Sequence, residues 1–385
     1  MKMNVFRLAW LQISSDRGRF AAAVAGVSFA VVLVLVQLGL RQALFASVEG
    51  LPNAMQAGLV LVSPVFQNLA TAGTFTQRRL YQALGDPDVA SVVPMYIRVT
   101  PIKNPVTGQQ RDIFVIAFPP ERGVLNLPEV DAQIDKLKLP DRALFDRLSR
   151  REFGPYVELL QKGPEVRTEI ETQPVYVAGL FTLGTSFAAD GNLVTSDLSF
   201  LHFLPDRKWG SINVGLIRLR PHADVRTVQA RLAHYLPGDV QVLTKKEFVA
   251  REHDYWDRST PIGFVFQLGV VMGLIVGGVI VYQILYTDVS EHLPDYATLK
   301  AIGYRDRFLF LLVMRQSLIL SICGFVPGVI IAQITYAVTR AATHLPVATS
   351  AVRLVAVYAL TLAMCAGAGT FAMLKVRSAD PAEVF

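Results

Sequence analysis

Charge and cysteine are both scarce in this sequence. Only 18% of its 385 residues are charged, against roughly 25% in an ordinary soluble domain. The two cysteines, Cys323 and Cys365, lie in apolar stretches, and residues 46–260 contain none. This absence excludes a disulfide scaffold for 46–260. That segment is about 215 residues long, which is enough to form a core without disulfides.

Several motifs of enzymes are missing as well. The chain contains no Gly-Lys pair, so a Walker A loop, GxxxxGK[ST], cannot be written anywhere. The six histidines form no HExxH or other metal spacing. Residues 184–188 fall one residue short of the nucleophile-elbow pattern GxSxG, and a turn follows them instead of a helix. We therefore expect a non-enzymatic chain with no catalytic residues, metal or cofactor of its own. If ATP drives it, another polypeptide must bind the nucleotide.

Long apolar runs are what the sequence has instead. Each has about 20 residues or more, enough at 1.5 Å per residue to cross a hydrocarbon core of about 30 Å. Lipid offers no hydrogen-bond partners to backbone N–H and C=O groups, so each run must form a helix, which pairs these groups internally. The stretches without any charge are 20–40, 261–287, 316–339 and 354–374. The expected membrane spans are 20–45, 261–287, 308–339 and 353–375.

Basic residues mark one side of the membrane. They precede the first span, lie between the second and third, and follow the fourth: Lys2, Arg7, Arg17, Arg19, Lys300, Arg305, Arg307, Lys375 and Arg377. By the positive-inside rule, residues 1–19, 288–307 and 376–385 are cytoplasmic. The segment 46–260 and a short loop, 340–352, are then external. The formal charge of +6 is thus explained without nucleic acid.

The first 19 residues predict an interfacial helix. Phe6, Ala9, Trp10 and Ile13 fall at i, i+3, i+4 and i+7, which places them on one helix face. Beside several arginines, such a helix lies on the inner leaflet; an irregular leader is the alternative. We expect the first span to be an uncleaved anchor, because its lead and its apolar run are long for a signal peptide. Cleavage near 43–46 is the competing interpretation.

The external segment predicts an α+β domain with two lobes. Strand, helix and strand patterns occur in 46–104 and again in 211–244, where Asp224 can cap the helix. Two such units around an insertion suggest a split ferredoxin-like lobe. The segment 245–260 is expected to continue the second span outward as a stiff helical stalk.

The insertion, 105–210, is richer in Pro and Gly and predicts a mainly β lobe. Its clearest strands are 175–183 and 192–195, joined through the turn pair Asp190-Gly191. A charged helical segment is expected before them, at 142–152.

Small residues predict helix packing in the spans. Gly269, Gly273 and Gly277 recur every four residues in the second span, a spacing that allows close helix approach in lipid. Packing within the chain and a homodimer seam are both open. Gly324, Pro327 and Gly328 are expected to bend or loosen the third span.

The loop 288–307 carries the most specific pattern. Pro294 can start a short helix and Gly303 can cap it. Apolar and aromatic side chains would project from this helix into the cytosol, which an ordinary connector does not require. We therefore expect it to be a docking helix for another protein. The predicted coupling residues are Leu293, Pro294, Tyr296, Ala297, Thr298, Leu299, Lys300, Ala301, Ile302, Gly303 and Tyr304.

Residues 296–304, YATLKAIGY, resemble the inner loop of FtsX-like and MacB-like ABC permeases. A wider set of segments is similar to the DevC family of exporter permeases, so the resemblance covers essentially the whole chain. These segments are 179–181, 190–192, 195–197, 252–256, 260–264, 281–286 and 288–304. The chain departs from related FtsX-like permeases at Gln316, where many carry an acidic residue.

This resemblance implies a fold, an activity and partners. The fold would be four transmembrane helices in a one-plus-three arrangement, a MacB-type external domain and an FtsX-like permease domain at 261–385. The activity would be that of the permease in a DevBCA/MacB-like tripartite exporter of the bacterial inner membrane. Its partners would be a second copy of the chain, two copies of an ATPase that binds ATP and Mg, a membrane-fusion adaptor and a TolC-like channel. Glycolipid is the cargo linked to the family.

Three other functions remain as alternatives. An FtsX-like regulator would pass ATPase motion to a cell-wall hydrolase, but about 215 external residues suit an adaptor-binding exporter better. A lipoprotein-releasing permease would require a pair of different permeases. A membrane-anchored enzyme is disfavoured because no set of polar residues converges on a site.

Overall fold

The computed structural model describes residues 5–186, 189–292, 294, 306–343, 345 and 347–377. The chain divides into two units. The first, which we call the helical unit, comprises Met1–Gln42, Ile262–Ala342 and Val347–Phe385. The second, which we call the sheet unit, comprises Ala43–Pro261 and Thr343–Pro346.

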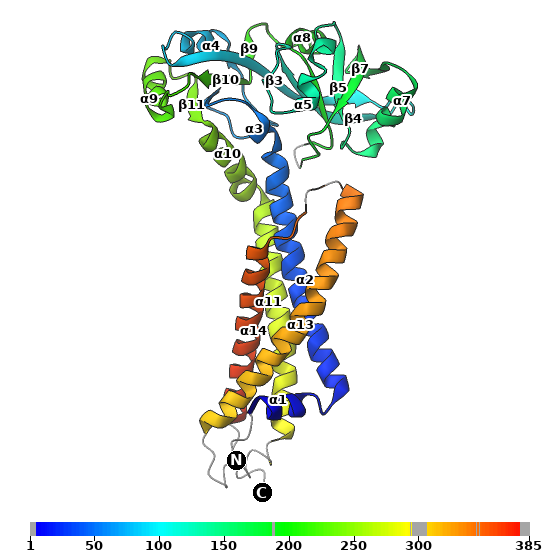
Figure 1. Cartoon of the computed structure of the whole chain (residues 1–385), viewed down its shortest axis with the longest axis vertical. Helices are drawn as coiled ribbons and strands as arrows, with labels where there is room; N and C mark the ends of the chain where they lie inside the picture. Colours follow the sequence, from blue (N-terminus) through cyan, green and yellow to red (C-terminus); the bar gives the residue numbers. More distant parts are fainter. Residues whose placement is uncertain are drawn as a thin grey trace. The chain divides into compact units, whose positions relative to one another are not determined.

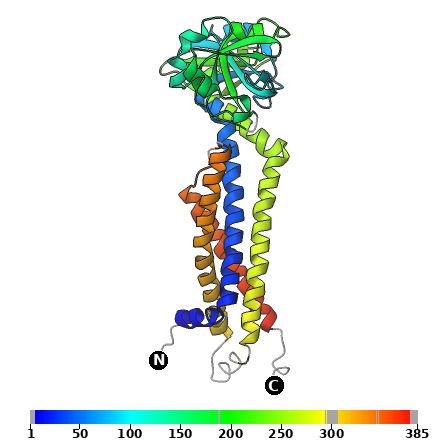
Figure 2. The same cartoon turned by 90° about the vertical axis from the view of Figure 1, so that its right-hand side faces the viewer.

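Long apolar helices make up the helical unit (Figures 1 and 2). Its helices, within the described ranges, are α1 (Val5–Ile13), α2 (Arg17–Val48), α11 (Pro261–Glu291), α13 (Asp306–Thr343) and α14 (Ala351–Arg377). Four segments are long and apolar enough to cross a membrane: Arg17–Val48, Pro261–Glu291, Phe310–Ala342 and Ala351–Leu374. The four predicted helices are therefore confirmed, with one before the sheet unit and three after it.

Helix α2 is the most enclosed of these four. In its most apolar stretch 44% of the residues are buried inside the protein, against 17% for α11. Small residues allow its neighbours to approach closely. A Cβ at Gly273 of α11 would lie 3.2 Å from the Cβ of Leu33, and one at Gly328 of α13 would also overlap α2. The Ser28 hydroxyl donates to the Gly324 carbonyl oxygen at 2.9 Å. Helix α2 therefore packs against both α11 and α13.

The third span is one uninterrupted helix. α13 continues through Pro327, whose missing N–H removes one backbone hydrogen bond. The glycines on either side of this proline, Gly324 and Gly328, face α2. These glycines therefore allow α13 to contact α2 closely, a role that the sequence analysis did not predict. The expected bend or loosening of the span stays a prediction.

Helix α1 runs at a steep angle to α2 (Figures 1 and 2). The residues of its predicted apolar face divide into two pairs: Ala9 and Ile13 are buried, whereas Phe6 and Trp10 are exposed. Asp16 then starts α2, because its Oδ1 accepts from the backbone N–H of Gly18 at 2.9 Å. The segment is thus a helix that presents large apolar side chains at its surface.

The sheet unit contains a nine-stranded sheet in the order β11-β1-β10-β3-β4-β8-β5-β7-β6. Its first four strands are mutually antiparallel and are β11 (Gln241–Thr244), β1 (Leu59–Val62), β10 (Val214–Leu219) and β3 (Val89–Lys103). Helices α4 (Arg78–Ala83) and α9 (Val225–Tyr235) connect them. In chain order these strands are numbered 4-1-3-2, which is the ferredoxin-like arrangement predicted for this lobe.

The inserted lobe is a closed barrel. Strand β3 continues into it and is followed in space by β4 (Gln110–Phe118), β8 (Asn192–Ser196), β5 (Arg142–Asp146), β7 (Gln173–Phe181) and β6 (Val166–Ile170). Strand β6 returns to β3 through the pair Ile102 and Ile170. Closure leaves the described barrel strands without a free edge, while β11 remains at the edge of the nine-stranded sheet.

One expectation for the inserted lobe is wrong. The segment 142–152 is not a helix: it is β5 followed by a turn and the short helix η1 (Arg151–Phe153). Ala143, Leu144 and Phe145 are all buried, so both faces of this strand meet protein and the helical spacing of charges was misleading. Strand β5 lies between β7 and β8 in the sheet and pairs with both.

The segment before the second span is helical, as predicted. Thr244 and Glu247 form a capping box at the start of α10 (Lys245–Asp254), and η2 (Tyr255–Ser259) continues it. Thr260 is in an extended conformation, so the helix is interrupted before α11. The prediction that this segment continues the second span without a break is therefore wrong. The remaining short elements are α3 (Gly50–Ala54), β2 (Phe75–Thr76), α5 (Pro128–Asp131), α6 (Ile134–Leu137), α7 (Tyr156–Lys162), α8 (Asp197–Phe203) and β9 (Ser211–Ile212).

Candidate functional site

The predicted coupling helix falls largely outside the described residues. This applies to Leu293 and to residues 296–304, while Pro294 is described as helical and exposed. The ATPase-docking role of these residues therefore stays a prediction. The structure does describe the two helices that flank them, α11 and α13.

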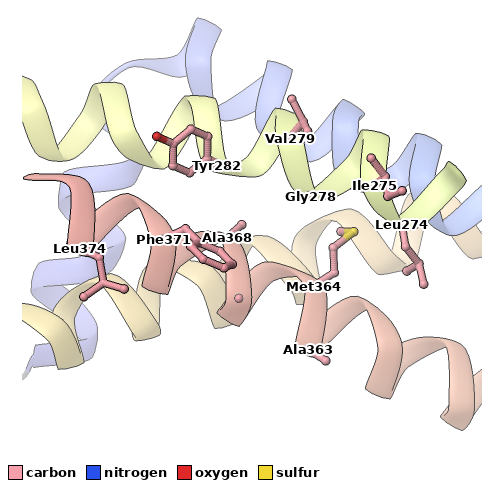
Figure 3. Close-up of a pocket in the computed structure, with 11 residues that line it drawn as sticks. Leu274, Ile275, Gly278, Val279, Tyr282, Ala363, Met364, Ala368, Phe371 and Leu374 are labelled. Carbon is pink, nitrogen blue, oxygen red and sulfur yellow. The ribbon is translucent and has the colours of Figure 1, made fainter. Parts of the chain in front are cut away.

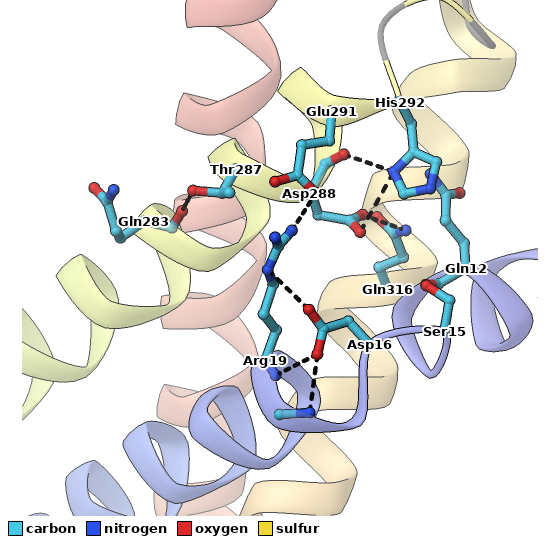
Figure 4. Close-up of polar contacts among 11 residues, drawn as sticks. Gln12, Ser15, Asp16, Arg19, Gln283, Thr287, Asp288, Glu291, His292 and Gln316 are labelled. Carbon is cyan, nitrogen blue, oxygen red and sulfur yellow. Dashed lines mark hydrogen bonds and ion pairs between the residues drawn. The ribbon is translucent and has the colours of Figure 1, made fainter.

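A group of polar side chains lies around the end of α11, near the start of α2 and beside α13 (Figure 4). We call it the loop-end cluster, and its members are Asp16, Arg19, Asp288, Glu291, His292 and Gln316. Arg19 of α2 pairs with Asp16 at 3.1 Å and also with Glu291 of α11. The side chains of these three are 43–50% exposed, so solvent screens their attraction and each pair contributes little to stability.

Asp288 and Gln316 form the buried part of this cluster. The Gln316 amide Nε2 donates to Oδ2 of Asp288 at 3.0 Å, and this bond joins α13 to α11. Gln316 is fully buried and the Asp288 side chain is 13% exposed. His292 places its Nδ1 2.9 Å from the Asp288 carbonyl oxygen and 3.7 Å from Oδ1. Among the described residues, the Gln316 Oε1 has no hydrogen-bond partner.

Sequence reasoning singled out Gln316 but not its partner. Asp288 directly follows the uncharged stretch 261–287, and a carboxylate at that depth needs a donor. The position of this carboxylate at the end of an uncharged span is the feature that could have prompted a search for its hydrogen-bond donor. Asp288 and Gln316 are 28 positions apart in the chain. Which residue of α13 donates to Asp288 depends on how α11 and α13 are aligned along each other, and one sequence does not show that alignment.

The glycines of the second span face α2 of the same chain. A Cβ at Gly269 would lie 2.5 Å from Cδ of Gln37, and one at Gly277 would overlap Ala30. The exposed apolar residues of α11 include Leu268 and Ile275. Packing within the chain therefore accounts for the glycine spacing, and the homodimer seam stays a prediction.

An apolar groove of about 740 Å³ runs between α11 and α14 (Figure 3). Gly278 and Gly367 line it, and a Cβ at Gly367 would meet nothing within 4 Å. Tyr282 of α11 and Phe371 and Leu374 of α14 line it further. This chemistry suits a hydrocarbon chain and offers no site for a charged group.

In the sheet unit, Glu252 is a buried carboxylate whose pKa is raised. Glu252 of α10 is buried and accepts from the Leu69 backbone N–H at 2.9 Å and from Trp256 Nε1 at 3.1 Å. Burial raises the pKa of this carboxyl to about 7, because desolvation outweighs the two donated hydrogen bonds. The Phe66 ring stacks on Phe248 of α10 at 5.2 Å. α10 is thereby fastened to the segment between β1 and β2.

No catalytic or metal site emerges from the described part of the chain. Within it, no three His, Cys, Asp or Glu side chains gather as metal ligands. Ser186, from the pattern that resembles a nucleophile elbow, is tied into its turn: its N–H donates to the Ala189 carbonyl oxygen at 3.0 Å. Asp146 is buried, but its oxygens accept from Gly184 N–H and Asn192 Nδ2, both at 2.8 Å. It therefore anchors a loop.

Residues 268–381 match the family described as FtsX-like permease C-terminal. The chain therefore contains an FtsX-like permease domain. The match covers most of α11 and all of α13 and α14, the helices that bear the groove and most of the loop-end cluster. It falls inside the range 261–385 predicted for this domain.

Three solved structures resemble part of the chain. The periplasmic region of MacB from Actinobacillus actinomycetemcomitans is 11% identical, covering 52% of this chain and 92% of that one, with a TM-score of 0.34. The extracellular domain of the noncanonic ABC-type transporter YknZ from Gram-positive bacteria is 15% identical, covering 48% and 99%, with a TM-score of 0.35. A domain of a putative permease protein from Porphyromonas gingivalis is 9% identical, covering 50% and 89%, with a TM-score of 0.32. No curated protein matches the chain.

Proposed function

We propose that this chain is the membrane permease of a tripartite ABC exporter of the MacB-like, DevC type. The observation that carries the proposal is the FtsX-like permease match over 268–381, in a chain with four spans and a large α+β unit between the first and second. A permease of this kind holds no ATP itself. ATP and Mg bind to two copies of a separate ATPase, which grip the loop 293–304 of two permease copies.

The spans favour mechanical work over a channel. Their buried hydroxyl side chains donate to backbone carbonyl oxygens, either within one helix, as from Ser317 to Val313 at 3.0 Å, or between helices, as from Ser28 to Gly324 at 2.9 Å. Such groups are already satisfied and do not line a polar path. We propose that ATP-driven closure of the ATPase moves α11 and α13, and that α2 and α10 pass this motion to the sheet unit.

The sheet unit would act outside the membrane. In this proposal the termini and the loop 288–307 are cytoplasmic, in accord with their basic residues. The sheet unit then meets a membrane-fusion adaptor and, through it, a TolC-like outer-membrane channel. Substrate, with glycolipid as the expected class, leaves from the periplasmic side or the outer leaflet of the inner membrane.

The second candidate is an FtsX-like regulator that activates a cell-wall hydrolase. It shares the permease match and needs no cargo path. A lipoprotein-releasing permease shares the same architecture but would require two different permease chains.

Affinity purification of the tagged chain from its native membrane in mild detergent, with mass spectrometry, tests the proposal. We expect a P-loop ATPase together with a periplasmic adaptor. An ATPase with a peptidoglycan hydrolase and no adaptor would favour the regulator. Recovery of the chain with no ATPase at all would overturn both.

A further inference from the structure

In the hydrogen bond between Asp288 and Gln316, the donor and the acceptor come from different helices. The amide Nε2 is the donor and the carboxylate Oδ2 is the acceptor, at 3.0 Å. Asp288 lies on the last turn of α11, and Gln316 lies on α13, the next helix after the loop. The pair thus joins the last turn of α11 to α13 at a point ten residues after α13 begins (Figure 4).

The surroundings of the pair make this bond specific. Gln316 is fully buried, and Leu285 and Val313 nearby in the chain are buried as well. Apolar side chains hold helices together in lipid without fixing their register, because lipid tails are equally apolar. A buried hydrogen bond to a charged group is stronger and directional. The pair therefore sets how α11 and α13 meet.

The charges around Asp288 leave little room for a second acid. Arg19 is engaged by Asp16 and Glu291, and the ring nitrogen of His292 is 3.7 Å from the Asp288 Oδ1. A carboxylate in place of the Gln316 amide would face the Asp288 carboxylate without an interposed donor. Exchanging the two groups, with the amide on α11 and the carboxylate on α13, would preserve the bond in reverse.

We infer that Asp288 and Gln316 are a positioning pair that fastens α11 to α13, so that force on the loop between them moves both helices together. The inference rests on the proposed function, since it assigns the pair to the step between ATPase and spans. Neither residue touches nucleotide; each acts through the helix that it holds.

Three variants test the pair: Gln316→Glu, Asp288→Asn and the two combined. Each is purified as the full chain with its co-purifying ATPase and placed in lipid nanodiscs. The amount of ATPase bound and the fold-stimulation of ATP hydrolysis by the permease are both measured. Gln333→Glu is the matched control, because it puts the same charge on α13, where the amide is exposed and bonds to Thr349.

Gln316→Glu should retain the ATPase but lose about tenfold of the stimulation, because two like charges meet in a buried site. Asp288→Asn should cost less. The combined variant should regain stimulation to within about twofold of the unaltered chain, the non-additivity expected of contacting residues, and Gln333→Glu should resemble the unaltered chain.

Two results would overturn the inference. One is full stimulation by Gln316→Glu; the other is a combined variant no better than Gln316→Glu alone. A merely structural role would lower ATPase recovery and stimulation together, and that outcome also counts against a positioning pair. If the unaltered chain recovers no ATPase, the proposed function has failed instead, so the two failures are distinguishable.

Discussion

At the scale of single residues, burial decides the behaviour of Glu252. Its carboxyl accepts two hydrogen bonds, yet its pKa rises to about 7 from the ordinary 4.5, because removal from water costs more than two donors return. A carboxyl whose pKa is higher in the folded state binds its proton more tightly there than in the unfolded chain. Its contribution to stability is therefore complete below about pH 4.5 and is lost as the pH rises through about 7.

We expect Glu252→Gln to remove this pH dependence. The interval between 4.5 and about 7 corresponds to about 3 kcal/mol. Thermal unfolding of the full chain in nanodiscs between pH 4.5 and 8.5 measures it: the unaltered chain should lose stability over this range, and the variant should lose much less. Glu121→Gln, at an exposed position, is the control and should keep the slope. A slope unchanged in Glu252→Gln would contradict this account.

At the scale of elements, glycine positions decide how the helices meet. A Cβ at Gly324 would overlap the Cβ of Val27 on α2, whereas a Cβ at Gly367 of α14 would meet nothing within 4 Å. A glycine-to-alanine substitution would therefore clash with α2 at Gly324 but find open space at Gly367.

We expect Gly324→Ala to destabilise the chain by about 1–3 kcal/mol, the usual cost of overpacking. Gly367→Ala should be neutral or slightly stabilising, because alanine favours a helix over glycine. Thermal unfolding of both variants in the same lipid provides the comparison. Equal melting temperatures would argue against close packing of α13 on α2.

The elements also show what one sequence can and cannot reveal. Apolar run length predicted the four long helices, and the repeated strand–helix–strand pattern predicted the ferredoxin-like lobe. Strand β5 was missed because its charged flanks suggested a helix, while its two faces are buried in two different hydrophobic clusters. Parallel pairs such as β4 with β8 join segments far apart in the chain, so their order was not predictable from local pattern.

The candidate site divides in the same way. The loop 293–304 stood out because its residue types are unusual for a connector, which is local information. The bond between Asp288 and Gln316 was not predicted, because it depends on how two helices are aligned along each other.

At the scale of the whole molecule, the loop between α11 and α13 should connect the chain to its energy source. We expect Leu299→Asp to lower ATPase co-purification by at least about tenfold with the fold intact, because a charge would be buried on an apolar docking face. Leu139→Asp, at an exposed apolar position of the sheet unit, should retain the ATPase. The two variants are compared by quantitative mass spectrometry of the co-purified proteins. ATPase recovery by Leu299→Asp equal to that of the unaltered chain would refute the docking role.

One strand belongs to both lobes of the sheet unit. β3 pairs with β10 as far as Met95 and with β4 from Tyr96 onward, with no loop between the two stretches. The two lobes therefore share one continuous strand, and no loop separates them along it. A rotation of the ferredoxin-like lobe would therefore be transmitted to the barrel through the backbone of β3.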